Sequence, residues 1–243
     1  MNLLATIQYD GTLFYGWQVQ PGKPTVQGEV MRALEKLYGE KVPLKYTSRT
    51  DRGVHAEGQV ITFSPPADIP AQRVIKALNR LLCDDVSVTG LRKCPDDFDP
   101  RYSVHSKMYA YRIFTGRHPG LTDKRYVWHL TGAVDWKAVR KGAGMIRGEH
   151  EFRLFSSSPE GHKTRINIIS CGVTRLGDIY EIRIRAPFFR TYMVRYLAGF
   201  LIAIGAGKRH TDDLRNMLEG EGRRCTFCAP ARGLVLRKIY FKG

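Results

Sequence analysis

The sequence has few cysteines, and its cysteines and histidines do not stand at the spacing of a metal site. Five cysteines are an odd, scattered set, unlike a secreted disulfide framework. Cys225 and Cys228 form one CxxC pair without the second pair that a zinc site needs, and no HExxH motif occurs. We therefore expect no metal and a reducing, cytoplasmic setting. A zinc- or thiol-dependent enzyme using these two cysteines is a rival interpretation.

Long hydrophobic runs and a basic leader are missing as well. The longest apolar stretch, Tyr196–Ala206, includes two glycines and is well short of the ~20 residues that cross a bilayer. Residues 1–9 have neither a positively charged leader nor a cleavage site. No P-loop or dinucleotide-binding glycine pattern occurs. We expect no membrane association and no nucleotide cofactor.

Acidic residues are scarce relative to basic ones. Lys and Arg number 39 against 23 Asp and Glu, which gives a formal net charge of +16. Hydrophobic residues make up 43%, a normal globular share, so the chain is not disordered as a whole. Such a positive excess is typical of a protein that binds a polyphosphate such as nucleic acid. A surface made basic for solubility alone is the other interpretation.

Strand and helix patterns alternate along the chain. Apolar residues at helical spacing follow Thr25, a good helix cap, and residues 180–186 alternate apolar and polar side chains as a half-buried strand does. This interleaving favours an α/β (α+β) fold with helices packed on sheet faces. A boundary between Cys94 and Ser106 predicts two subdomains, residues 1–104 and 105–243. We expect strands at 3–9, 59–63, 86–88, 108–114, 166–174, 179–186 and 234–241, and helices after Thr25, at 70–82, after Asp135, at 189–206 and after Thr211.

The densest polar cluster is Ser48–His55, with the sequence SRTDRGVH. Its carboxylate, Asp51, stands between Arg49 and Arg52, and neighbouring guanidiniums favour the ionised form, which suits a base or a nucleophile. The alternative is a simple turn, in which the Asp caps, Gly53 takes an unusual φ and the arginines are solvated. The residues alone leave both interpretations open.

Aromatic residues accompany cations in two further segments. A helix over 189–206 would place Arg195 on one side with aromatic residues, where it could pair with a buried carboxylate or extend to water. Tyr109 and Tyr111 share one face of their strand, with Lys107 nearby, and could stack on RNA bases or fill the core. The aromatic residues on the side of Arg195 are Phe188, Tyr192 and Tyr196.

Taken together, these segments resemble the tRNA pseudouridine synthase A family from end to end. The block Arg49-Thr50-Asp51 with Gly53-Val54-His55-Ala56 is highly specific for that family. The other matching stretches, in family order, are Tyr9–Gln18, Thr25–Gly28, Gly58–Val60, Asp97-Phe98, Arg101–Ser103, Tyr109–Arg112, Phe189 with Met193–Arg195, and Ala229–Leu234.

The resemblance implies an enzyme that isomerises uridine to pseudouridine at positions 38, 39 and 40 of the tRNA anticodon arm. By the same resemblance, Asp51 is the catalytic carboxylate, Arg195 is its salt-bridge partner and Tyr109 contacts the target base. Leu234 corresponds to an apolar contact beneath the base, and Arg49 to a contact with the flipped nucleotide or its backbone. His55 and Arg52 are further candidates for substrate binding in the same loop.

The resemblance also implies a fold of two ferredoxin-like or RRM-like subdomains joined across a basic cleft, in a homodimer that needs no cofactor. Two departures stand out. Arg52 occupies a position where alanine is usual, and Asp99-Pro100 replaces a common His-Ala pair. Neither departure removes a catalytic residue, although Arg52 adds charge to the expected cleft. A non-catalytic RNA-binding module of the same fold is the alternative function.

Overall fold

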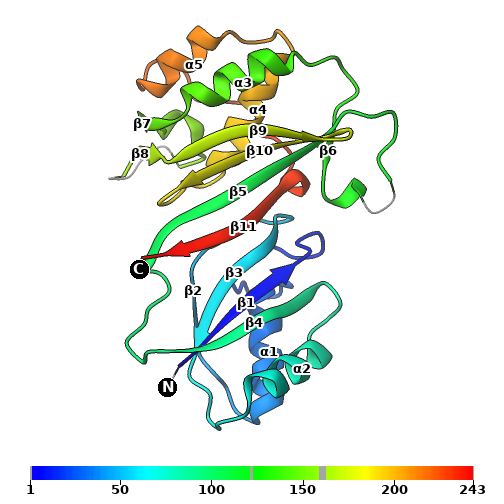
Figure 1. Ribbon diagram of the computed structural model, residues 1–243, viewed down its shortest axis with the longest axis vertical. Coiled ribbons are helices and arrows are strands. Elements are labelled where there is room, and N and C mark those ends of the chain that lie inside the picture. Colours follow the sequence, from blue (N-terminus) through cyan, green and yellow to red (C-terminus); the bar gives the residue numbers. More distant parts are fainter. Residues whose placement is uncertain (1, 121–122, 159–162, 243) are drawn as a thin grey trace. The chain divides into compact units, whose positions relative to one another are not determined.

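The computed structural model describes residues 2–120, 123–158 and 163–242, which form a mixed α/β protein (Figure 1). The chain divides into two units. Unit 1 comprises Met1–His105 with Val235–Gly243, and unit 2 comprises Ser106–Leu234. The α/β class expected from the alternating patterns is confirmed.

Unit 1 has a ferredoxin-like βαββαβ arrangement. Its antiparallel strands lie in the order β4-β1-β3-β2, and β11 pairs in parallel with β3. Helices α1 and α2 pack against each other. The elements are β1 (Asn2–Tyr9), α1 (Val26–Tyr38), β2 (Leu44–Tyr46), β3 (His55–Phe63), α2 (Ala71–Leu81), β4 (Val86–Cys94) and β11 (Leu234–Phe241).

Local chemistry explains where α1 begins and which face it buries. The side chain of Thr25 accepts a hydrogen bond from the backbone N–H of Gly28, satisfying one of the unpaired donors at the helix start. Val26, Val30 and Leu34 recur at helical spacing and are buried. The helix ends at Gly39, whose φ of 78° lies in the left-handed region that glycine adopts without strain.

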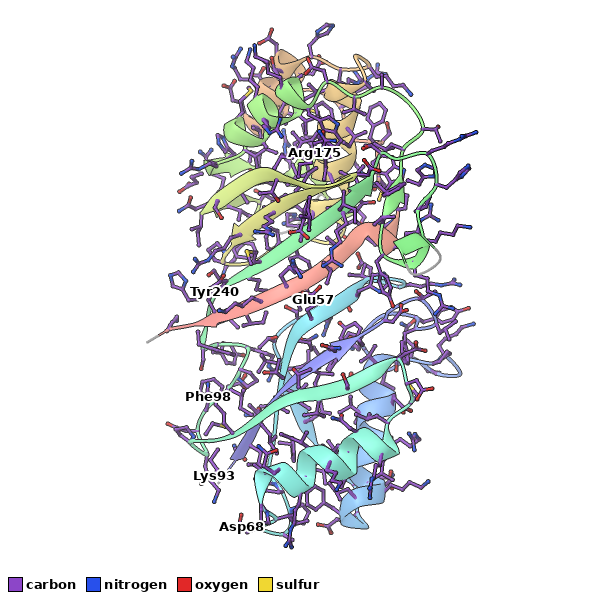
Figure 2. All side chains as sticks on the ribbon, turned by 45° about the vertical axis from the view of Figure 1, so that its right-hand side comes forward. Glu57, Asp68, Lys93, Phe98, Arg175 and Tyr240 are labelled. Atoms are coloured by element: carbon purple, nitrogen blue, oxygen red, sulfur yellow. The ribbon has the colours of Figure 1, made fainter. Side chains whose placement is uncertain are left out.

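Strand β11 joins unit 1 from the far end of the sequence. Val235 lies opposite His55 in the parallel ladder, and Arg237 forms an ion pair with Glu57 of β3 (Glu57 is labelled in Figure 2). A Cβ at Gly58 would lie 2.6 Å from the carbonyl oxygen of Arg237, so this pairing requires glycine there. The expected division at 104–105 assigned the last strand to the second subdomain. The structure groups Val235–Gly243 with unit 1 because of this ladder.

Unit 2 combines a sheet in the order β6-β5-β10-β9 with a separate β7-β8 pair. Helices α3, α4 and α5 are grouped on one side of this sheet, where α3 contacts α4, α5 and β9 (Figure 1). The elements are β5 (Val104–Phe114), β6 (Trp128–His129), α3 (Trp136–Met145), β7 (Gly148–Glu151), β8 (Arg165–Ile168), β9 (Ser170–Leu176), β10 (Ile179–Ala186), α4 (Met193–Gly205) and α5 (Thr211–Leu218).

The core of unit 2 surrounds α4, in which every residue except Arg195 is buried. Glycines allow its neighbours to approach closely: a Cβ at Gly199 would overlap the carbonyl oxygen of Phe227, and one at Gly205 would lie 2.6 Å from a methyl group of Val139. Both glycines therefore permit the close packing of α4 against its neighbours. Within the described ranges, no helix combines the length and the apolar character needed to span a membrane.

Several elements differ from the sequence-based expectation: strands β3, β4 and β5 are longer than expected, and β2, β6 and β7 were not expected. Three further differences have a visible structural cause. Helix α4 begins at Met193 instead of Phe189, because Tyr192 adopts a left-handed φ of 62° and interrupts the helical backbone. The expected strand 166–174 is divided at Ile169, since β8 pairs with β7 whereas β9 pairs with β10. Helix α5 begins at Thr211, but its cap is His210, whose N–H donates to Asp213 Oδ2 at 2.9 Å.

Candidate active site

The loop that carries Asp51 lies between β2 and β3 and is hydrogen-bonded to the first strand and the loop that follows it. The backbone N–H of Trp17 donates to the Thr50 carbonyl at 3.1 Å, and the hydroxyls of Tyr9 and Thr50 lie 2.7 Å apart. The N–H of Val54 donates to the Asp51 carbonyl at 3.1 Å, closing a turn around the half-buried carboxylate. Asp51 therefore stands on a fixed backbone.

A buried amide holds the beginning of the same loop. Gln59 of β3 is 0% exposed. Its Nε2 donates to the Ser48 carbonyl at 2.7 Å, and its Oε1 accepts from the Thr47 hydroxyl at 2.8 Å. In the sequence, Gln59 was indicated as the first residue of an expected strand and as part of a family stretch, and no function was assigned to it. Its position directly before the run Val60–Phe63, which is mostly apolar, was the available signal, because an amide buried in such a strand must find partners.

Three glycines allow this loop to pack against residues 10–17. A Cβ at Gly11 would overlap the carbonyl oxygen of Val54, and one at Gly16 would lie 2.6 Å from the carbonyl oxygen of Thr50. Gly16 and Gly53 have φ of 91° and 74°, in the left-handed region. The turn interpretation of the sequence is thus correct for the backbone, and the turn presents the Asp51 side chain.

His55 lies beneath the loop, with 4% of its surface exposed. Its Nδ1 is 3.1 Å from Asp10 Oδ1 and 3.0 Å from the backbone nitrogen of Gly11. The same Asp10 oxygen accepts hydrogen bonds from both the N–H and the hydroxyl of Thr12. His55, expected among the substrate-binding residues, therefore joins the two loops from the inside of unit 1.

Arg49 and Arg52 extend outward on either side of Asp51. Both are exposed. The Nε–H of Arg49 donates to the Tyr46 hydroxyl at 3.3 Å, and the guanidinium of Arg52 lies 4.1 Å from the centroid of the Tyr15 ring. Stacking on an aromatic face orders the Arg52 side chain while its charge stays in solvent. The loop thus presents one carboxylate flanked by two accessible cations.

The tyrosines of β5 are buried in unit 2. Tyr109 is 7% exposed and meets Phe189 edge to face, with ring centroids 5.2 Å apart, while Tyr111 is 0% exposed. The Tyr111 hydroxyl donates to the Pro230 carbonyl at 2.7 Å, and burial raises the pKa of this phenol. Tyr111 is therefore a core residue, which was one of the two interpretations of the pattern.

Arg195 is the half-buried cation of α4. Its Nε–H donates to the Ala229 carbonyl at 2.8 Å, and the N–H of Ala229 donates back to the Arg195 carbonyl at 3.1 Å. The guanidinium also lies 4.8 Å from the centroid of the Tyr192 ring. Within unit 2, its terminal nitrogens donate to no described residue. The hydrogen bond from Nε orients the guanidinium, and its two terminal nitrogens can donate to an anion.

Leu234 follows the segment that holds Arg195. It is 5% exposed and follows the short 3-10 turn Ala231–Gly233. A Cβ at Gly233 would lie 2.7 Å from the Tyr111 ring, so this turn packs directly on β5. Unit 2 therefore holds the three candidate residues on elements that pack together. These residues are Tyr109 on β5, Arg195 on α4 and Leu234 after the turn.

The buried Cys225 thiol shows little of the character of a reactive group. Burial raises the pKa of Cys225 to about 11, and a nucleophilic or metal-binding cysteine must be a thiolate. Across the described ranges, no three His, Cys, Asp or Glu side chains gather in a way that would hold a metal ion. The zinc- or thiol-dependent interpretation gains no support from this geometry.

The comparisons with known proteins agree with this combination of fold and motifs. The family described as tRNA pseudouridine synthase matches residues 5–103 and 143–242. The chain belongs to this family. Among its relatives are proteins named tRNA pseudouridine synthase A from Bacillus pumilus (strain SAFR-032) and Bacillus subtilis (strain 168), each 38% identical over 99% of both chains. A protein of that name from Aquifex aeolicus (strain VF5) is 35% identical over 98% of both chains.

Proposed function

We propose that this protein isomerises uridine to pseudouridine in tRNA, with Asp51 as the catalytic carboxylate. The observation that carries the proposal is the Asp51 loop: a specific family motif on a backbone fixed by Trp17, Tyr9 and Gln59. A carboxylate that acts on a sugar carbon needs such a fixed position, because reacting atoms must be held within about 3–3.5 Å of each other.

The reaction itself matches the residues. The N1–C1′ glycosidic bond breaks, the uracil turns, C5 bonds to C1′, and the proton lost from C5 is balanced by one gained at N1. Asp51 either attacks C1′ or removes a proton from C2′; both routes need an ionised carboxylate. The target base must be turned out of the helix before it is reached, as other base-modifying enzymes require.

The other residues have complementary roles in this proposal. Arg195 pairs with the Asp51 carboxylate and keeps it ionised, since a buried carboxylate without a cation takes up a proton. Tyr109 holds the detached uracil and assists removal of the C5 proton. Leu234 supplies an apolar contact beneath the base. Arg49 and Arg52, which are exposed, contact phosphates beside the target nucleotide.

The finer features of the assignment are part of the same proposal. The target uridines are those of the anticodon arm, at positions 38, 39 and 40. The protein acts as a homodimer, in the cytoplasm. The net charge of +16 supports an RNA substrate, because phosphate contacts dominate affinity for nucleic acids. Light scattering of the purified protein tests the dimer.

The experiment that tests the activity is incubation of the protein with unmodified tRNA, followed by carbodiimide labelling to map pseudouridine. We expect modification in the anticodon arm and a loss of about 10²–10⁴-fold or more in rate for Asp51→Asn. Asp68→Asn makes the same chemical change at an exposed carboxylate, 3.6 Å from Lys93 (both labelled in Figure 2), and should keep the wild-type rate.

The outcome distinguishes the enzyme from a non-catalytic RNA-binding module. An enzyme loses its rate in Asp51→Asn while the variant still binds tRNA in a filter-binding assay. A wild-type protein that binds tRNA and forms no pseudouridine would be the binding module. An Asp51→Asn variant with the wild-type rate would remove Asp51 from the mechanism.

A further inference from the structure

A cavity of about 340 Å³ lies in unit 2, beside the C-terminal half of α5. Three arginines line it: Arg209, Arg223 and Arg224. Two carboxylates, Asp213 and Glu221, also reach its wall, so the lining keeps a net positive charge. Neither the Asp51 motif nor the residues around Arg195 account for this cluster.

These three guanidiniums form no ion pair with any carboxylate of the described part of the chain. Other arginines of the protein do so, for example Arg112 with Glu181 at 3.2 Å and Arg215 with Asp212 at 2.6 Å. Like charges gathered in one concavity repel each other, and a bound anion relieves that repulsion. The cluster therefore fits an anionic ligand.

Aromatic rings hold two of the three cations in place. The guanidinium of Arg209 lies 5.5 Å from the centroid of Phe227, and that of Arg224 lies 5.8 Å from the centroid of Tyr196. Arg224 also donates to the Tyr196 hydroxyl at 3.1 Å. The positions of these charges are thus ordered before any ligand arrives, which lowers the entropy cost of binding.

The cavity is linked to Arg195 through the aromatic pair Tyr192 and Tyr196. Tyr196, which receives the Arg224 hydrogen bond, has its ring centroid 6.5 Å from that of Tyr192, against which Arg195 lies. Along the chain, five residues lead from Arg224 to Ala229, the partner of Arg195, and they span at most roughly 18 Å. A nucleic-acid strand that reaches Arg195 can therefore reach the cavity within a few nucleotides.

We infer that this cavity binds a backbone phosphate of the tRNA, a few nucleotides away from the target uridine. Arg209 and Arg223 supply the positive charge, and Arg224 connects the phosphate site to the aromatic pair beside Arg195. This inference rests on the proposed function for its ligand, and it adds a substrate-binding site that the catalytic motifs do not include.

The test measures how tRNA affinity depends on salt for the double variant Arg209→Gln/Arg223→Gln. Each neutralised phosphate contributes about 0.7–0.9 to the slope of log K against log salt concentration, so loss of this one phosphate contact should lower the slope by about 0.7–0.9. The ratio of variant to wild-type Kd should then be about threefold larger at 50 mM salt than at 200 mM. Arg209→Lys/Arg223→Lys keeps both charges and should keep most of the slope.

The matched control removes two charges elsewhere in unit 2. Arg140→Gln/Lys141→Gln changes exposed residues of α3 and should keep the wild-type slope. If both double variants reduce the slope equally, the effect is one of net charge and the inference is wrong. An unchanged slope in the Arg209/Arg223 variant, with a wild-type thermal transition, overturns it as well. Absence of pseudouridine formation by the wild type refutes the proposed function and leaves the binding result standing.

Discussion

Replacing Gln59 with leucine tests whether the buried amide fixes the Asp51 loop. The change removes the donor to the Ser48 carbonyl and the acceptor for the Thr47 hydroxyl, at a site that is 0% exposed. Losing a hydrogen bond at a buried polar group costs about 1–3 kcal/mol, so the two lost bonds should lower the free energy of unfolding by about 2–6 kcal/mol. For a protein of this size, that corresponds to a decrease of about 4–24 °C in Tm.

The same substitution should also lower kcat, by more than any loss of folded protein would explain. A displacement of about 1 Å at a reacting group costs about 10²-fold in rate, so we expect kcat to fall by about that factor at a temperature where the variant is folded. Scanning calorimetry gives Tm, and carbodiimide mapping gives the rate. Gln72→Leu, at an exposed position of α2, is the control and should change neither. A Gln59→Leu variant that matches this control in both measurements refutes the reasoning.

Three further predictions concern backbone contact, pH and thiol chemistry. Gly11→Ala should lower Tm and kcat, since its Cβ would overlap the Val54 carbonyl, and overpacking costs about 1–3 kcal/mol. Burial lowers the pKa of Lys107 from 10.5 to about 8, so between these values the unfolded chain binds more protons and the contribution of this group to stability rises with pH. Calorimetry at pH 7 and pH 9.5 should show that rise diminished in Lys107→Met. Because burial raises the pKa of Cys225 to about 11, iodoacetamide near neutral pH should leave that thiol unmodified in the folded protein, as read by mass spectrometry.

Each of these three has its own control. Gly90→Ala adds the same methyl group to β4, where the nearest atom is 3.7 Å away, and should not affect kcat. For Lys107, the control is the wild-type protein. If its stability rises with pH as much as that of Lys107→Met, another group causes the rise and the prediction is wrong. Modification of Cys225 at the rate of the unfolded chain would contradict its burial.

Local patterns predicted many of the elements and the family motif. The Thr25 cap with its apolar spacing located α1, and alternation located β10, because both signals act between residues that are close along the chain. The run around Asp51 identified the candidate catalytic loop for the same reason. The limits of α4 were less well predicted, since the left-handed backbone of Tyr192 has no signal in the residue type.

By itself, then, the sequence determined the α/β class, the basic charge and the Asp51 motif, all of which depend on composition or on neighbours along the chain. Only the tertiary structure decided that Gln59 holds the loop, that Tyr111 belongs to the core, and that β11 pairs with β3 from the far end of the sequence. It also gathered Arg209 and Arg224 around one cavity. The physical reason is that these contacts join residues distant in sequence. Such contacts stabilise the protein only once the chain has folded and brought the residues together.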